Sequence, residues 1–189
     1  MGPDQVLSLY LDMEAHGVRL WLMGGWGVDS LLGHQTRIHH DVDVVVEVAT
    51  LERFRGRLHE LGFELQYLWD DETWSVHDPS WSTADELPTA FVHAHPDGRE
   101  IDVHVVRLDE LRGVLTLWNA PYEFTLQGLQ GRGKVAGQPV RCLTREMQIE
   151  AHTGYELPPH HAADLRLLLD KPLHGSVSGH PTNGFDPDR

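Results

Sequence analysis

The spacing of apolar residues predicts that the chain begins with alternating helices and strands. Residues 3–16 carry apolar side chains at helical spacing, and the run VRLWLM at 18–23 is typical of a strand. Gly24 and Gly25 then predict a tight turn, and residues 26–33 predict a short helix that is closed by its last residue, a glycine.

A second strand and a hairpin follow. The valine-rich run DVDVVVEV at 41–48 predicts a central strand, and Thr50 is placed to cap the next helix. Residues 89–108, TAFVHAHPDGREIDVHVVRL, alternate apolar and polar residues on both sides of Pro96-Asp97-Gly98, which is typical of a turn. This order indicates an α/β (α+β) fold in which helices flank a small mixed sheet.

Composition divides the chain into three parts. Residues 1–108 form the expected core, and residues 109–174 contain short strands, loops and two C-terminal helices that complete a cleft. From residue 175 the composition shifts to Gly, Pro, Ser and Asp, so 175–189 is expected to be a disordered tail.

Charge narrows the class of partner. The chain has 29 Asp and Glu against 15 Lys and Arg, a formal net charge of −14 with neutral histidines. This field repels a phosphate backbone and attracts a cationic small molecule, so it disfavours nucleic acid as a partner. No apolar run approaches the roughly 20 residues that cross a bilayer, and the single cysteine, Cys142, cannot form an internal disulfide. We therefore expect a cytoplasmic protein with no membrane partner.

Three aspartates are the candidate metal ligands. Residues two apart on a strand share a face, so Asp41 and Asp43 project together while the valines between and after them face the core. Ionised carboxylates so close repel each other unless a cation lies between them, and rigid oxygen ligands suit Mg²⁺. In REIDVHVV, Asp102 lies opposite the apolar face. If that strand lies beside the first, the three carboxylates could clamp two metal ions about 3.5 to 4 Å apart.

The glycine doublet has two interpretations. A glycine turn at a helix start leaves backbone N–H groups free and allows a polyphosphate to approach. Alone, a glycine doublet is more often only a strand-to-helix turn, just as D-x-D alone often only solvates a strand end. The order of strand, Gly-Gly, helix, D-x-D strand and later apolar-Asp-apolar strand is much more specific than either feature.

The segment GGWGVDSLLGHQTRIHHDVDVVV, with REIDVHVV, QIEAHTGYEL and DLRLLL downstream, resembles the antibiotic nucleotidyltransferases of the polymerase-β-like superfamily. Within that superfamily it resembles the lincosamide nucleotidyltransferases and the aminoglycoside 2″-adenylyltransferases, and the likeness covers residues 5–172. The resemblance implies a polymerase-β-like nucleotidyltransferase fold. It also implies Mg²⁺-dependent transfer of a nucleoside monophosphate, with AMP expected, from a nucleoside triphosphate to a drug hydroxyl, releasing pyrophosphate.

Carried over residue by residue, the resemblance implies that Asp41 and Asp43 bind two Mg²⁺ ions and that Asp102 is a metal ligand, a general base or both. The nucleotide-binding residues that it implies lie in the glycine turn, the following helix start and the loop before D-x-D: Gly24, Gly25, Trp26, Arg37 and His39. Much of the superfamily has Gly-Ser in place of Gly-Gly, so a serine contact to phosphate is expected to be absent.

Several side chains allow two interpretations. Arg37 suits either a phosphate or an acidic neighbour, and His39 suits either a phosphate or a carboxylate. Asp29 either holds the loop of Arg37 or is a solvated helix acid, and His152 and Tyr155 either line the pocket or only pack their helix. The fourteen histidines, which include the pair His160-His161, show no recognisable zinc spacing.

Three alternatives to an antibiotic-modifying enzyme remain open. D-x-D also occurs in metal-dependent glycosyltransferases, although these usually have a longer nucleotide-binding domain before it. A nucleotidyltransferase of toxin type would modify RNA or a protein, and a non-catalytic member would only bind a nucleotide. The intact carboxylates argue against the last. The sequence leaves open the acceptor, the base preference and a homodimer with a shared pocket.

Overall fold

The structure is a computed structural model that describes residues 1–69, 74–76, 89–111, 113–117, 122–153 and 157–170. The helices are α1 (Pro3–Ala15), α2 (Gly24–Leu32), α3 (Leu51–Glu60), α4 (Arg145–Ala151) and α5 (Pro159–Asp170). The strands are β1 (Leu20–Met23), β2 (Asp41–Glu47), β3 (Glu64–Trp69), β4 (Trp74–Val76), β5 (Ala90–Ala94), β6 (Glu100–Asp109), β7 (Gly113–Thr116), β8 (Arg132–Val135) and β9 (Gln138–Arg141).

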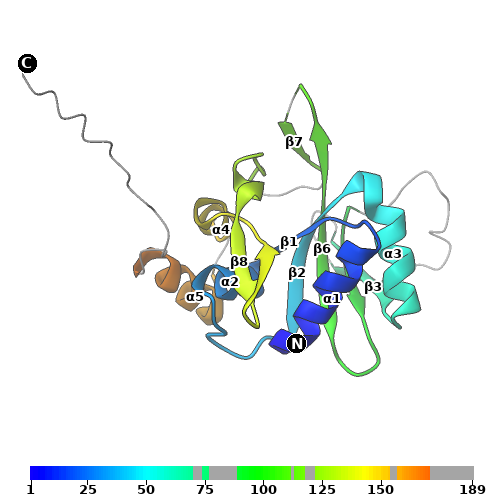
Figure 1. Cartoon of the computed structure of the whole chain (residues 1–189), viewed down its shortest axis with the longest axis horizontal. Coiled ribbons are helices and arrows are strands. Elements are labelled where there is room, and N and C mark those ends of the chain that lie inside the picture. Colours follow the sequence, from blue (N-terminus) through cyan, green and yellow to red (C-terminus); the bar gives the residue numbers. More distant parts are fainter. Residues whose placement is uncertain (70–73, 77–88, 112, 118–121, 154–156, 171–189) are drawn as a thin grey trace, which may run out of the picture.

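A mixed seven-stranded sheet forms the centre of the molecule, and helices flank it (Figure 1). Its strand order is β1-β2-β6-β5-β3-β4, with β7 also paired to β6, while β8 and β9 form a separate hairpin. Strands β2 and β6 run parallel, and β1 and β5 pair antiparallel to them. This topology confirms the predicted α+β class with a small mixed sheet. The tail expected at 175–189 lies outside the described residues.

The start of α2 differs from the sequence prediction. Gly24 and Gly25 form the first turn of the helix itself, and no separate turn precedes it. Gly24 has φ +56°, a left-handed conformation that glycine adopts without a steric cost, and the helix begins directly after β1. Gly33 closes the helix with φ +77°, as predicted.

One face of the sheet is apolar along its length. Val42, Val44 and Val46 of β2 are fully buried against α1 and α3, together with the apolar residues of β6: Ile101, Val103 and Val105. Each such side chain contributes roughly 1.5–3 kcal/mol by leaving water. Because side chains alternate along a strand, the acidic residues between them lie on the other face.

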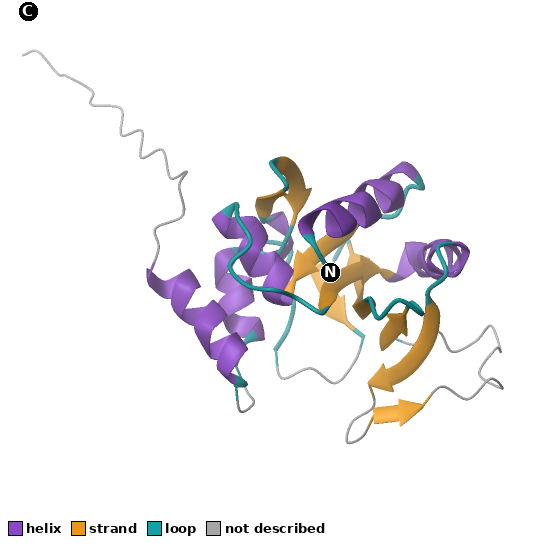
Figure 2. Ribbon diagram, turned by 90° about the horizontal axis from the view of Figure 1, so that it is seen from below, coloured by secondary structure: helices purple, strands orange, loops and turns teal. Residues whose placement is uncertain are grey.

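The second face is apolar only at one end. There Val45 of β2 packs with residues of β1, β6, α4 and the segment before β8, and the Trp21 indole donates to the Leu129 carbonyl at 2.7 Å. Strand β1 also binds the chain after β9, since the Leu143 amide donates to the Leu22 carbonyl at 3.0 Å. Figure 2 shows the strands between a group containing α2, α4 and α5 and a second group containing α1 and α3.

None of the helices in the described part of the chain combines the length and apolar character needed to cross a bilayer.

Candidate active site

Four carboxylates from two strands meet at the polar end of the sheet. The parallel register of β2 and β6 sets Asp43 beside Asp102 and Asp41 beside Glu100. Paired strands lie about 4.8 Å apart, so each carboxylate has a like charge opposite it. The adjacency that the sequence analysis assumed is therefore confirmed. Glu100 was missed, although its position two residues before Asp102 already placed it on the same face.

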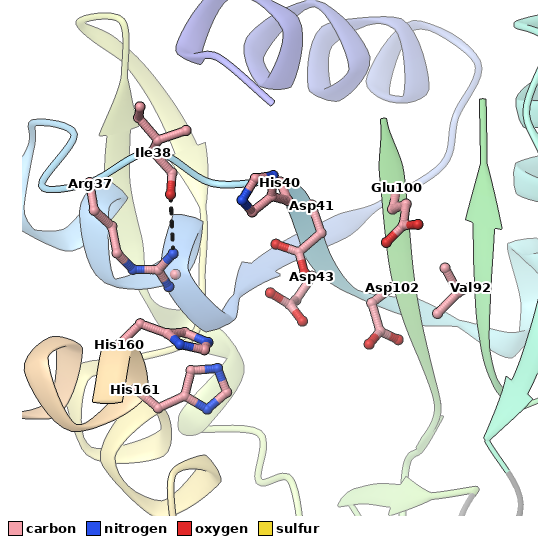
Figure 3. Close-up of a pocket in the computed structure, with 11 residues that line it drawn as sticks. Arg37, Ile38, His40, Asp41, Asp43, Val92, Glu100, Asp102, His160 and His161 are labelled. Carbon is pink, nitrogen blue, oxygen red and sulfur yellow. Dashed lines mark hydrogen bonds between the residues drawn. The ribbon is translucent and has the colours of Figure 1, made fainter. Parts of the chain in front are cut away.

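A cleft of about 500 Å³ opens over these carboxylates (Figure 3). The carboxylates of β2 and β6 lie on one side, and Arg37 and two histidines of α5 lie across from them (Figure 3). The described residues that line the cleft are Gly25, Arg37, Ile38, His40, Asp41, Asp43, Val92, Glu100, Asp102, His160 and His161. The cleft thus brings together residues from both the first and the last described segments of the chain.

The electrostatics of Asp43 indicate a cation site. Burial of the carboxyl, and then the charges of Asp41 and Asp102, raise the pKa of Asp43 well above its ordinary value, while Arg37 opposes this shift. A partly buried carboxylate surrounded by like charges is costly unless a cation compensates it. The surroundings of Asp43 therefore fit a divalent metal ion.

The ligand atoms also converge. Asp43, Asp102 and His104 each offer one ligand atom, and these three atoms lie within 4.8 Å of one another. The His104 Nε2 lies 3.5 Å from Asp102 Oδ1, and burial lowers the pKa of His104 despite that carboxylate, which favours the neutral imidazole. The two aspartates supply the oxygen ligands that Mg²⁺ prefers. Asp41 lies on the same face of the cleft, beside Glu100.

The two glycines allow close approach to the start of α2. A Cβ atom on Gly24 would lie 2.1 Å from Asp43 Oδ2. A Cβ atom on Gly25 would lie 2.5 Å from His39 Nδ1 and 2.6 Å from Arg37 Nη2. Side-chain nitrogens thus occupy the space that a serine at position 25 would need, which gives a physical reason for the Gly-Gly doublet.

Asp29 organises the loop that precedes β2. Its buried carboxylate accepts hydrogen bonds from the Thr36 amide at 3.1 Å and the Thr36 hydroxyl at 2.5 Å, and it lies 2.5 Å from the His39 Nε2. Asp29 therefore holds the loop of Arg37, and the interpretation as a solvated helix acid is wrong.

Trp26 and His39 lie beneath the cleft and do not line it. Both side chains are buried, and their ring centroids are 4.9 Å apart. His39 pairs with the Asp29 carboxylate, and a carboxylate was one of the two contacts predicted for it. Asp29 holds the imidazole in the interior, and the nucleotide contact expected of Trp26 and His39 stays a prediction. Gly25 and Arg37 line the cleft as expected, while Gly24 lies directly behind Asp43.

Arg37 is held by an acid that the sequence analysis missed. Asp164 of α5, which is 1% exposed, accepts from Arg37 Nη2 at 2.7 Å and from Arg37 Nε at 3.2 Å. Burial lowers the pKa of Arg37, but the hydrogen bond and charge of Asp164 outweigh it and raise that pKa overall. The sequence signal was an acid four residues before the apolar Leu168, a spacing that places the two side chains on the same face of α5.

Asp164→Asn is expected to destabilise the protein by about 2–4 kcal/mol, because it leaves the partly buried Arg37 without its counter-charge. Urea unfolding measures this change. Asp12→Asn is the matched control, since Asp12 forms a bidentate pair with Arg57 at 2.7 Å but its side chain is 25% exposed, against 1% for Asp164, so its loss should cost less. Equal losses of stability in the two variants would show that the pair of Arg37 and Asp164 stabilises the protein no more than the pair of Asp12 and Arg57 does.

His152 is buried at the end of α4, and its Nδ1 lies 2.6 Å from the Gln148 carbonyl oxygen. Its ring touches that of His161 with centroids 5.3 Å apart. His152 therefore packs its helix behind the cleft, while Tyr155 lies outside the described residues.

The chain is similar to proteins that modify antibiotics. A profile of the family described as aminoglycoside-2″-adenylyltransferase matches residues 5–168. A lincosamide resistance protein of Staphylococcus haemolyticus is 25% identical over 169 residues, which cover 87% of this chain and 93% of the relative.

Two solved structures share the fold. The lincomycin-bound lincosamide antibiotic adenylyltransferase LnuA superposes with a TM-score of 0.70 and 21% identity, over 88% of this chain and 96% of the other. The enzyme ANT(2″)-Ia in complex with adenylyl-2″-tobramycin superposes with a TM-score of 0.62 and 21% identity, over 88% of this chain and 86% of the other.

Proposed function

We propose that this chain, which belongs to the aminoglycoside-2″-adenylyltransferase family, transfers a nucleoside monophosphate from a nucleoside triphosphate to a hydroxyl group of a small-molecule antibiotic. The observation that carries this proposal is the in-register pair of Asp43 and Asp102 in a cleft bordered by the first turn of α2. AMP is the group expected to be transferred, and a lincosamide or an aminoglycoside is the expected acceptor, by analogy with the relatives.

The carboxylates have distinct roles in this proposal. Asp43 and Asp102, with Asp41 beside them, would hold Mg²⁺, which when bound neutralises charge on the phosphate oxygens and on the departing pyrophosphate. Asp102 also accepts the proton of the acceptor hydroxyl, whose oxygen then bonds to the α-phosphorus as the bond to pyrophosphate breaks. The backbone at the start of α2 presents N–H groups to the phosphates at the positive end of the helix.

Charge in the cleft favours a cationic acceptor. Arg37 is paired with Asp164, so its charge offsets the four carboxylates of β2 and β6 only in part. Glu100 lies outside the group of converging ligand atoms and is available to an ammonium group of the acceptor.

The test is to incubate the protein with Mg²⁺, each of the four nucleoside triphosphates and a panel of lincosamides and aminoglycosides, and to read product masses. A mass equal to drug plus nucleoside monophosphate, with pyrophosphate released, is the expected result. Triphosphate binding without any drug adduct would indicate that the acceptor is an RNA or a protein, and it would refute the antibiotic part of the proposal.

Mg²⁺ is expected to stabilise the protein more strongly as pH rises. The pKa of Asp43 is higher in the folded than in the unfolded chain, so metal-free stability falls as pH rises from about 3.9, the ordinary carboxyl pKa, toward the raised value. Mg²⁺ must displace the proton that Asp43 retains at low pH. Thermal unfolding at pH 5 to 8, with Mg²⁺ or with EDTA, measures the effect. A Mg²⁺-induced shift in Tm that is the same at every pH would contradict this assignment.

A further inference from the structure

The wall of the cleft opposite the carboxylates carries side-chain nitrogens to which the mechanism above assigns no role. His160 and His161 belong to the first turn of α5, and both point into the cleft beside Arg37 (Figure 3). His40 also lines the cleft, but it lies next to Asp41 on the carboxylate side (Figure 3). The cleft is therefore divided into an acidic side and a nitrogen-rich side.

The histidines form a packed group. The ring centroids of His160 and His161 are 4.4 Å apart, and His152 of α4 contacts His161 from behind at 5.3 Å. The charged groups that face His161 are these two histidines, Asp164 on its own helix and Arg37 on the loop before β2. The ring of His161 is therefore packed between His152 and His160, while His160 is exposed.

We propose that His160 and His161, together with Arg37, bind the β- and γ-phosphates of the nucleoside triphosphate, the part that leaves as pyrophosphate. This inference rests on the proposed function and identifies the part of the nucleotide that the nitrogen-rich side of the cleft binds. A triphosphate carries several negative charges, and the carboxylates of β2 and β6 repel it wherever a cation does not intervene. Arginine and imidazole N–H groups on the other side supply the charge-assisted hydrogen bonds that phosphate oxygens need.

The environment of His161 makes this site responsive to its ligand. Burial, and then the neighbouring His152 and His160, lower the pKa of His161 to about 4, while Asp164 opposes this shift. The imidazole is therefore uncharged at neutral pH in the free protein. A polyphosphate placed against it favours the protonated ring, so binding takes up a proton and weakens as pH rises.

The test measures binding to the full chain in Mg²⁺, with no acceptor present, by titration calorimetry. Inorganic pyrophosphate and ATP probe the proposed contacts, and AMP serves as a ligand that lacks the β- and γ-phosphates. His161→Gln is expected to weaken pyrophosphate and ATP about tenfold, with a larger loss when His160→Gln is added, and to leave AMP unchanged. His59→Gln is the matched control, because His59 is an exposed histidine of α3 paired with Glu64 at 2.8 Å.

Two results would overturn the inference. An equal loss of AMP affinity would place the histidines against the base or the α-phosphate. Unchanged pyrophosphate affinity with a raised KM for the acceptor would place them in the acceptor site. Thermal unfolding of each variant checks that it folds. If His161 proves necessary for the fold, His160→Gln is tested alone, because His160 is exposed.

The two proposals can fail separately. Drug adducts formed by the wild type, with normal pyrophosphate binding in the histidine variants, would overturn the phosphate contacts and leave the transfer reaction intact. Histidine-dependent pyrophosphate binding without any drug adduct would support the phosphate contacts and overturn the antibiotic acceptor.

Discussion

Asp43→Asn is expected to reduce nucleotidyl transfer by at least about a hundredfold while making the metal-free protein more resistant to heat. The loss follows because the amide removes a negative ligand from the group formed with Asp102 and His104, and metal stabilisation of developing charge accounts for several kcal/mol of a barrier. The gain in stability follows because the same change removes a partly buried carboxyl that Asp41 and Asp102 repel.

Opposite signs for activity and stability separate this prediction from simple misfolding. Product formation and Tm in EDTA are measured on the same preparation. Asp97→Asn is the control, since its carboxylate lies in the exposed turn before β6 and the hydrogen bond from Arg99 lowers its pKa. That variant should keep full activity and lose a little stability. Near-normal transfer by Asp43→Asn would show that the site is assigned wrongly.

Gly24→Ala is expected to lower kcat/KM at least about a hundredfold, because its methyl group would lie 2.1 Å from Asp43 Oδ2 and must displace that carboxylate. Gly33→Ala is a control on the same helix. Both glycines have positive φ, +56° and +77°, so each alanine pays a backbone cost of roughly 1–2 kcal/mol. No atom lies within 4 Å of a Cβ placed on Gly33.

The comparison of these two variants isolates the contact from the backbone strain. Urea unfolding should show a loss of stability in both, and steady-state kinetics should show a loss of activity in Gly24→Ala alone. If both variants lose activity equally, then the conformation of α2, and not the position of Asp43, limits the reaction.

The acidic side of the site could be predicted from the sequence because it depends on local periodicity. Alternation along β2 places Asp41 and Asp43 on one face, and alternation along β6 places Asp102 opposite the apolar residues of that strand, without knowledge of the fold. The same rule would have found Glu100 and His104, which lie two residues on either side of Asp102. The parallel register that pairs the strands is a tertiary property, and the sequence could only assume it.

The nitrogen-rich side could not be predicted in this way. Arg37 and Asp164 are 127 residues apart in the chain, and no local pattern joins them. His39 is buried because Asp29 lies ten residues before it on α2 and turns its carboxylate toward the loop. His160 and His161 were considered only as zinc ligands, because spacing along a helix does not reveal which cleft its first turn faces.

The ion pair between Arg37 and Asp164 implies an order of assembly during synthesis. A nascent chain holds all the residues that pair β2 with β6 once residue 109 has been made, so the carboxylates can gather early. The counter-charge of Arg37, Asp164, is the last of 55 further residues, 110–164, to be added. At about 5–20 residues per second this delay is roughly 3–11 s. The residues of the acidic side of the cleft are therefore synthesised before those that complete its nitrogen-rich side.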